Sequence, residues 1–225
     1  MLFACVPSAL EALRAEGLGD RSIFVGDPMY DAFCYYAELQ KNTPSPTLAR
    51  IDGHAVTPEG AYFYLTCHRE ENTRDDATLS EVLRAMNALD APTYYPVHPR
   101  NRDTARRLCE TLGLSKIRLL EPVGYLESLW LVRHAKRIVT DSGGVQREAY
   151  FARVPCVTVF PYVVWPETMT GRCNQLAEPN ERDILAKMTV APVWSDAQPF
   201  GDGHACEKIC AALREPSASG SFGQA

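Results

Sequence analysis

Short apolar runs alternate with amphipathic segments through the middle of the chain. Runs such as AYFYLT carry no charge, as is typical of parallel strands buried on both faces, while the segments between them repeat apolar residues every three or four positions, as helices do. The pattern predicts strands at 61–66, 93–97, 117–121, 137–140 and 156–160, and helices at about 77–89, 102–112, 125–134 and 144–152. This alternation predicts an α/β fold with a Rossmann-like, doubly wound parallel sheet.

The two ends of the chain are less regular. The elements expected there are a helix at 7–17, a strand at 22–26, a helix at 29–40, a short strand at 174–177 and a helix at 202–213. Residues 41–60 are rich in proline and glycine and show little periodicity, which predicts a connector. The polar segment at 214–225 predicts a disordered tail.

Composition narrows the class of protein. The chain has 225 residues, of which 46% are hydrophobic, so it can bury a sizeable core. Its net charge of -5, with both signs interspersed, provides no basic stripe for a nucleic-acid partner. The eight cysteines form no CxxC pair, and no apolar run is long enough to span a membrane. We therefore expect a soluble, cytoplasmic protein with reduced cysteines and with no nucleic-acid or membrane partner.

Polar residues gather where predicted strands end, which is where ligands bind in open parallel sheets. The segment TDSGGVQREA at 140–149 passes from a strand into a helix, so the backbone N–H groups of Gly143 and Gly144 can receive a phosphate, with Ser142 as an additional donor. Glu148 lies one helical turn beyond Gly144, about 6 Å away, where a carboxylate can accept from ribose hydroxyls. The alternative is that Ser-Gly-Gly forms only a tight turn.

His68 ends the first long strand and can donate to a phosphate or leaving group near neutral pH, or it can simply cap the following turn. His98 has the same placement, and the alternative for His98-Pro99-Arg100 is a rigid turn with a structural histidine. The sequence contains no HExxH motif, cysteine pair or histidine cluster for a metal, and Ser142 lacks the GxSxG pattern of a serine hydrolase. Neither a metal nor another cofactor is expected.

A family resemblance joins these features. The blocks that carry it are VGDPMYDAF (25–33), TCHREENT (66–73), YPVHPR (95–100), EPVGYLE (121–127), TDSGGVQREA (140–149), VPCVTV (154–159), PET (166–168) and PFGDGHA (199–205). In this order and spacing, from about Leu2 to Leu213, the chain resembles the non-hydrolysing UDP-N-acetylglucosamine 2-epimerases.

That family has two Rossmann-like domains facing each other, the GT-B arrangement, with the substrate between them. The resemblance implies that 1–26 is the end of a first domain, 27–60 a helix and linker, and 61–213 the second, nucleotide-binding domain. It assigns the pyrophosphate of UDP to Ser142, Gly143 and Gly144, the ribose to Glu148, the uracil to the loop at Val123, and a catalytic place beside the phosphates to His68.

The family reaction eliminates UDP across C1 and C2 of the sugar, then adds it back after C2 is protonated on the opposite face. In the family, the carboxylates that move the C2 proton lie on the first domain, most of which is outside this chain. There are also departures from the family pattern: Phe160 and Trp165 stand where arginines are usual, and Ser128 stands where an aromatic residue can pack on uracil.

Two functions remain open from the sequence. The first is the UDP-sugar-binding half of an epimerase, an isomerase that needs a first domain from a separate polypeptide or a longer form of this one. The second is a non-catalytic module that binds or senses nucleotide sugars. The identity of the sugar stays open, as does the oligomeric state, for which a homodimer is one possibility.

Overall fold

The computed structural model describes residues 1–214, which form two compact units. The central unit comprises Leu39–Ser195, and the terminal unit comprises Met1–Glu38 together with the segment from Asp196 onward. This division places the linker at 39–60 with the sheet and the last helix with the N-terminal segment. The functional boundaries expected at 26, 60 and 213 stay a prediction, and the tail expected at 214–225 lies, apart from Arg214, outside the described residues.

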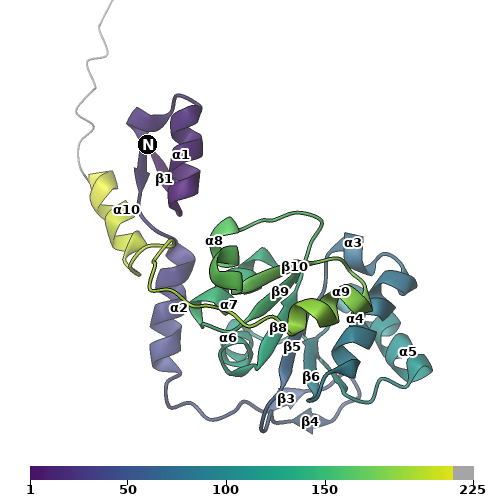
Figure 1. Cartoon of the computed structure of the whole chain (residues 1–225). Helices are drawn as coiled ribbons and strands as arrows, with labels where there is room; N and C mark the ends of the chain where they lie inside the picture. The colour runs from purple at the N-terminus through teal and green to yellow at the C-terminus, as the bar shows by residue number, and fades with distance from the viewer. Residues whose placement is uncertain (215–225) are drawn as a thin grey trace, which may run out of the picture. The chain divides into compact units, whose positions relative to one another are not determined.

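A six-stranded parallel sheet forms the middle of the central unit (Figure 1). Its strands are β5 (Phe63–Thr66), β6 (Thr93–Pro96), β7 (Ile117–Leu120), β8 (Arg137–Thr140), β9 (Cys156–Val159) and β10 (Asn174–Ala177). All six were predicted, with ends within two residues. The register pairs Phe63 with Thr93 on one side and with Arg137 on the other, so β5 lies between β6 and β8.

The order of the strands defines where a ligand can bind. Across the sheet the order is β10-β9-β8-β5-β6-β7. The chain therefore moves outward from β5 to β7, returns to β8 beside β5, and moves outward in the opposite direction to β10. The region beyond the carboxyl ends of β5 and β8 is thus the topological switch point of a doubly wound sheet, where ligands bind in such folds.

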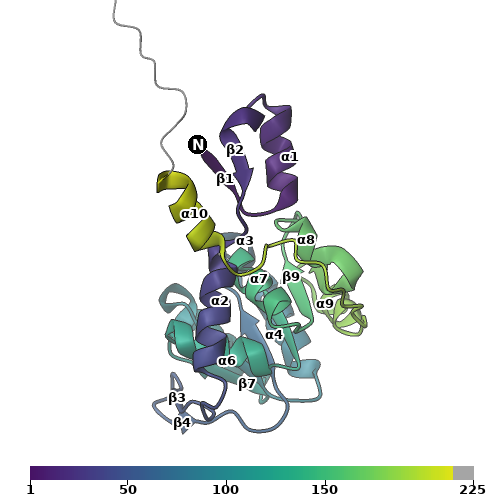
Figure 2. The same cartoon turned by 90° about the vertical axis from the view of Figure 1, so that its left-hand side faces the viewer.

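Helices cover both faces of this sheet (Figures 1 and 2). The helices of the central unit are α3 (Glu70–Thr73), α4 (Asp76–Ala88), α5 (Arg102–Leu112), α6 (Tyr125–His134), α7 (Gly143–Phe151), α8 (Pro166–Met169) and α9 (Glu181–Met188), with short 3-10 turns at Pro99–Asn101 and Thr170–Arg172. Buried residues of α4, α5 and α9 pack on one face, and those of α6 and α7 pack on the other. Burial on both faces explains why the strands are almost continuously apolar.

The linker is more ordered than its sequence predicts. It contains a hairpin formed by β3 (Leu48–Ala49) and β4 (Ala55–Val56). The N–H of Ile51 donates to the carbonyl of Leu119 (3.2 Å), and the N–H of Glu121 donates to the carbonyl of Ala49 (2.9 Å). The hairpin therefore pairs with the outer edge of β7, and the sequence did not reveal it because two-residue strands leave no periodic pattern.

The terminal unit contains a second, much smaller sheet. Strands β1 (Leu2–Ala4) and β2 (Ser22–Phe24) pair in parallel, with helix α1 (Pro7–Ala15) and a 3-10 turn (Gly19–Arg21) between them. Helices α2 (Pro28–Leu39) and α10 (Ala205–Arg214) complete the unit. Strand β1 was not predicted, and α10 begins at Ala205 rather than at 202.

Two sequence blocks far apart in the chain meet in this unit. Gly26 and Gly201 both have positive φ, of 93° and 87°, and a Cβ on Gly201 would lie 2.8 Å from the Cα of Gly26. The carboxylate of Asp31 accepts hydrogen bonds from the N–H groups of Ala205 (3.0 Å) and Cys206 (2.7 Å) at the start of α10. The blocks VGDPMYDAF and PFGDGHA are therefore one structural feature, in which α2 caps α10.

No helix within residues 1–214 has the length and apolar character needed to cross a lipid bilayer.

We expect Gly201→Ala to weaken the packing between α2 and α10. The new methyl group would meet backbone at Gly26, and the positive φ adds strain, so the expected loss is about 2–4 kcal/mol. Gly17→Ala is the matched control, because Gly17 also has a positive φ but no heavy atom within 4 Å of its Cβ position; its expected loss is about 1 kcal/mol. Hydrogen exchange of the α10 amides measures both, and equal losses would contradict the close contact.

Candidate functional site

Asp141 is the centre of the cluster at the switch point. Its side chain follows β8 and is almost fully buried, with the residue 1% exposed. The carboxylate accepts hydrogen bonds from the N–H groups of His68 (2.9 Å) and Arg69 (2.8 Å) and from the side-chain amide of Asn72 (3.3 Å). Because a buried carboxylate is costly unless it is hydrogen-bonded, these donors fix the loop after β5 against the end of β8.

His68 is held by the same carboxylate. Its Nδ1 lies 3.1 Å from Oδ1 of Asp141, while 44% of its side chain remains exposed. This hydrogen bond raises the pKa of His68 above the usual 6.5. Burial would raise the pKa of Asp141, but the hydrogen bonds from His68 and from the N–H of Arg69 lower it overall. His68 therefore keeps its positive charge to a higher pH than a free histidine, in a position where solvent or an anion can reach it.

Helix α7 begins beside this pair. Ser142 is its N-cap residue, and its Oγ accepts from the N–H of Val145 (3.4 Å). In the part of the chain that the structure describes, no protein group accepts a hydrogen bond from the N–H groups of Gly143 and Gly144. These N–H groups and the positive end of the helix dipole form a site suited to an anion.

The two glycines are not required by the backbone, since neither has a positive φ. A Cβ on Gly143 would lie 3.2 Å from Nε1 and 3.6 Å from Cδ1 of Trp165. The absence of a side chain at Gly143 therefore lets the indole of Trp165 pack against the first turn of α7. Gly144 follows in the same turn.

Glu148 is a second buried carboxyl group, 4% exposed, on the face of α7 that also carries Gly144. Burial raises its pKa from 4.5 to about 7, although a hydrogen bond from Tyr125 and the charge of Arg147 act in the opposite direction. A carboxyl group with so high a pKa in a crevice is a feature of functional sites. It can accept hydrogen bonds from hydroxyl groups of a ligand that lies along the helix.

Val123 follows the edge strand β7 and precedes helix α6. The next helix, α6, packs beside α7, and Tyr125 at its start reaches Glu148. Val123 itself is partly buried against the cluster on this face of the sheet. Ser128 also lies on this side, where its Oγ is 3.0 Å from the hydroxyl of Tyr64.

His68, Ser142, Gly143, Gly144 and Glu148 therefore lie at the switch point or on the first turns of α7, and Val123 lies on the face of the sheet that α6 and α7 cover. The anchoring role of Asp141 was not predicted, although its place directly after a strand and before Ser142 was the available signal. The hydroxyls of Thr66 and Thr140, 2.6 Å apart, are a further link between β5 and β8 that sequence could not reveal. His98 has the structural place of an N-cap, because its Nδ1 accepts from the N–H of Arg100 (3.3 Å).

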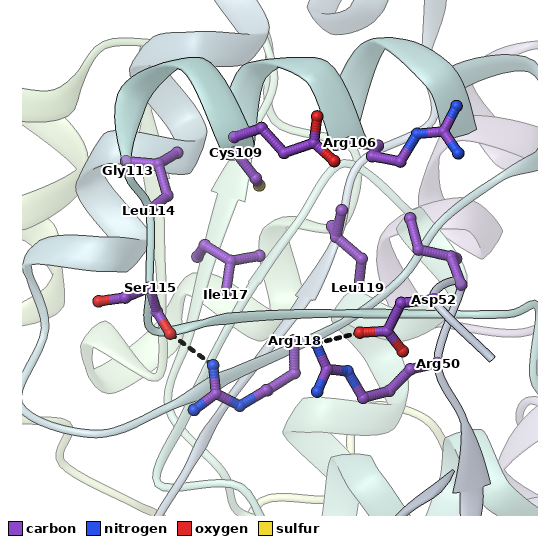
Figure 3. Close-up of a pocket in the computed structure, with 12 residues that line it drawn as sticks. Arg50, Asp52, Arg106, Cys109, Gly113, Leu114, Ser115, Ile117, Arg118 and Leu119 are labelled. Carbon is purple, nitrogen blue, oxygen red and sulfur yellow. Dashed lines mark hydrogen bonds and ion pairs between the residues drawn. The ribbon is translucent and has the colours of Figure 1, made fainter. Parts of the chain in front are cut away.

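A cavity of about 440 Å³ lies elsewhere, at the outer edge of β7 (Figure 3). It is bounded by Ile117 and Leu119 of the strand, the last turns of α5 and the hairpin residues Arg50 and Asp52, which form an ion pair (2.6 Å). None of the six predicted residues lines it. Within residues 1–214 no three His, Cys, Asp or Glu side chains are grouped closely enough to hold a metal ion.

The strand order and the switch-point cluster define a doubly wound, Rossmann-like α/β domain. Residues 1–214 match the family model described as UDP-N-acetylglucosamine 2-epimerase. The chain belongs to that family.

Individual relatives agree. The chain is 34% identical over 219 residues to the UDP-N-acetylglucosamine 2-epimerase homolog of Methanococcus maripaludis, with 95% of this chain and 60% of that protein covered. It is also 34% identical over 220 residues to the UDP-2,3-diacetamido-2,3-dideoxy-D-glucuronate 2-epimerase of Pseudomonas aeruginosa, with 93% and 58% covered.

A solved structure is similar as well. The crystal structure of Methanocaldococcus jannaschii UDP-GlcNAc 2-epimerase in complex with UDP-GlcNAc and UDP superposes with a TM-score of 0.76 at 28% identity. The superposition covers 94% of this chain and 60% of the Methanocaldococcus chain. The chain thus spans about 60% of the length of these relatives.

Asp141→Asn should destabilise the central unit by about 2–4 kcal/mol, because an amide at this buried position turns donors toward the donors of His68, Arg69 and Asn72. The pKa of His68 should fall toward that of a free histidine. Urea unfolding, monitored by tryptophan fluorescence, measures the loss of stability. An NMR titration of the His68 ring measures the change in its pKa. Asp103→Asn is the control, since that side chain is 87% exposed and should change stability by no more than about 0.5 kcal/mol.

Glu148→Gln should remove the free-energy cost of ionising a buried carboxyl group, which lowers the stability of the folded chain as pH rises. Between pH 4.5 and about 7 the folded chain holds a proton on Glu148 that the unfolded chain has released, so the free energy of unfolding falls as pH rises through this interval. Relative to the unaltered chain, the variant should gain stability progressively, by up to about 3 kcal/mol above pH 7. Urea unfolding at pH 5, 6, 7 and 8 measures the gain; a difference independent of pH would contradict the raised pKa.

Proposed function

We propose that this chain is the UDP-sugar-binding half of a UDP-N-acetylglucosamine 2-epimerase, which interconverts UDP-N-acetylglucosamine and UDP-N-acetylmannosamine. The observation that supports it most directly is the meeting of His68, Ser142, the two glycine N–H groups and Glu148 at the switch point of a chain that belongs to this family. A diphosphate and a ribose require an anion site and a hydrogen-bond acceptor about one helical turn apart, which this arrangement provides.

Each part of UDP has a proposed partner. The pyrophosphate lies against the N–H groups of Gly143 and Gly144, with Ser142 and His68 beside it. The ribose hydroxyls donate to the carboxylate of Glu148, and the uracil lies near the loop at Val123. Protonated His68 stabilises the negative charge that grows on the diphosphate when the C1–oxygen bond breaks, which makes it the catalytic group of this half.

The proton at C2 needs a different group. Asp141 is buried and already accepts several hydrogen bonds, and Glu148 is assigned to the ribose. We place the acid and base for C2 on a first domain outside this chain, as the family resemblance implies. UDP binding then belongs to the described chain, and proton transfer belongs to its interface with that first domain.

The terminal unit supports the need for such a domain. Parallel sheets normally have more strands and are covered on both faces, yet within residues 1–214 β1 and β2 form a sheet of two strands, with Ile23 38% and Phe24 37% exposed. Helix α1 contributes no buried residue. We infer that further strands, on the same or a separate polypeptide, complete this sheet.

The sugar itself is left open by this proposal. The relative from Pseudomonas is named for a diacetamido glucuronate, whereas the relative from Methanococcus is named for N-acetylglucosamine. Both UDP-sugars share the diphosphate, ribose and uracil that this half is proposed to hold. Discrimination between the sugars then lies largely with the first domain, so both are suitable substrates for a test.

UDP titration by calorimetry tests the binding half of the proposal. The 225-residue chain should bind UDP, and Gly144→Val should weaken binding by about 100-fold, because a bulky side chain displaces the phosphate from two charge-assisted hydrogen bonds. The backbone at Gly144 accommodates valine, since its φ is not positive. Val145→Ala, one position further into the helix, is a control that should bind UDP within a few-fold of the unaltered chain.

Turnover is tested separately. In D2O, the chain fused behind the first-domain segment of the Methanococcus relative should incorporate deuterium at C2 of UDP-N-acetylglucosamine or of the diacetamido glucuronate sugar, and the chain alone should not. UDP binding without deuterium incorporation in the fusion would favour the non-catalytic nucleotide-sugar module. Failure of the unaltered chain to bind UDP would refute both functions.

A further inference from the structure

Two arginine side chains near the start of α7 are stacked on aromatic rings. The guanidinium carbon of Arg69 lies 4.2 Å from the ring centre of Phe160, and that of Arg147 lies 4.2 Å from the ring centre of Trp165. Both rings belong to the segment 160–165, which follows β9 and leads into α8. One segment therefore places an aromatic face under each of two cations.

Both cations lie close to the proposed diphosphate site. Nε of Arg69 donates to the carbonyl of Asp141 (2.9 Å), directly before Ser142. Nε of Arg147 lies 3.4 Å from the carbonyl of Gly143, and side chains in a helix lean toward its N-terminus. The indole of Trp165 is the group that would contact a Cβ on Gly143. The Arg147–Trp165 stack is thus built against the first turn of α7.

This geometry favours binding of an anion. An aromatic ring contacts the flat face of a guanidinium, whereas the N–H groups point outward along its edge, where they can meet phosphate oxygens in pairs. Stacking also restricts the arginine before a ligand arrives, so less conformational entropy is lost on binding. Arg69 is restrained in addition by its hydrogen bond to the carbonyl of Asp141, and Arg147 by the contact of its Nε with the carbonyl of Gly143.

We infer that Arg147, positioned by Trp165, is a diphosphate-binding residue of this site; the inference rests on the proposed function. The family resemblance places arginines at the positions of Phe160 and Trp165. In this chain the positive charge comes instead from Arg147 on α7, with Arg69 arranged in the same way on Phe160. Where the family has an arginine in the segment 160–165, this chain has Trp165. The positive charge of the site is then supplied by Arg147 on the adjacent helix α7.

Calorimetric titration of the 225-residue chain with UDP, UMP and uridine tests this assignment. Arg147→Ala should weaken UDP binding by about 10- to 30-fold and leave uridine binding within about two-fold, because the lost contact is to phosphate. Arg147→Lys should retain part of the affinity, since lysine keeps the charge but lacks the planar fork. Trp165→Ala should weaken UDP binding by several-fold, because Arg147 loses its support.

The double variant Arg147→Ala/Trp165→Arg is the most specific test. It returns an arginine to the segment 160–165, so it should recover UDP affinity to within about three-fold of the unaltered chain. Arg106→Ala is the matched control: Arg106 lies on α5 and pairs with Asp103 at 2.9 Å, away from the switch point, and its loss should leave all three affinities unchanged. Retained uridine binding verifies that each variant is folded.

The possible results separate the inference from the function on which it rests. If the unaltered chain binds UDP and Arg147→Ala binds it equally well, the role of Arg147 is overturned and the proposed function stands. If UDP and uridine affinities fall together in Arg147→Ala, the residue supports the fold and not the phosphate, which also overturns it. If the unaltered chain binds no UDP, both proposals fail.

Discussion

The buried carboxylate of Asp141 links the ends of β5 and β8, the two neighbouring strands at which the strand order of the sheet reverses. Taking this charge out of water is costly, and the donors that offset the cost come from the loop after β5 and from Asn72 of α3, the helix that follows it. That loop has no helix or strand of its own until α3, so Asp141 determines its path. The positions of His68 and Arg69 beside the start of α7 follow from this one set of hydrogen bonds.

Two buried carboxyl groups on neighbouring elements therefore do different work. Asp141 has a lowered pKa because donors surround it, whereas Glu148 has a pKa near 7 because burial removes water and supplies few donors in return. The first is a fixed structural anion. Glu148 receives fewer hydrogen bonds than Asp141 does. It is therefore the carboxylate that gains more from a ligand carrying hydroxyl groups. The same contrast explains why His68, bonded to the first, tends to stay cationic.

The sequence was sufficient for the sheet and its main helices because strands buried on both faces leave unmistakable apolar runs, and amphipathic helices leave periodic ones. It did not reveal β1, the β3–β4 hairpin or the short helices α8 and α9, since two- to four-residue elements leave no period and α9 was marked only by the N-cap at Asn180. Strand ends located Ser142, the two glycines and Glu148. The link between His68 and Asp141, and the stacks on Phe160 and Trp165, depend on strand order and loop path, which no local pattern encodes.

The two units of the chain differ in how much of their sheet is buried and paired, and therefore in what stabilises them. The central unit buries apolar residues on both faces of six strands and has what it needs to fold by itself. Within residues 1–214 the parallel pair β1–β2 has no third strand, the helix α1 between its strands has no buried residue, and its hydrogen-bonding edges are of the kind that neighbouring strands normally satisfy. A two-domain enzyme built from such parts would hold its nucleotide rigidly on the central unit and assemble its proton-transfer groups only where a complete first sheet is present. Under the proposed function, nucleotide binding is then a property of this chain, and catalysis is a property of the completed pair of domains.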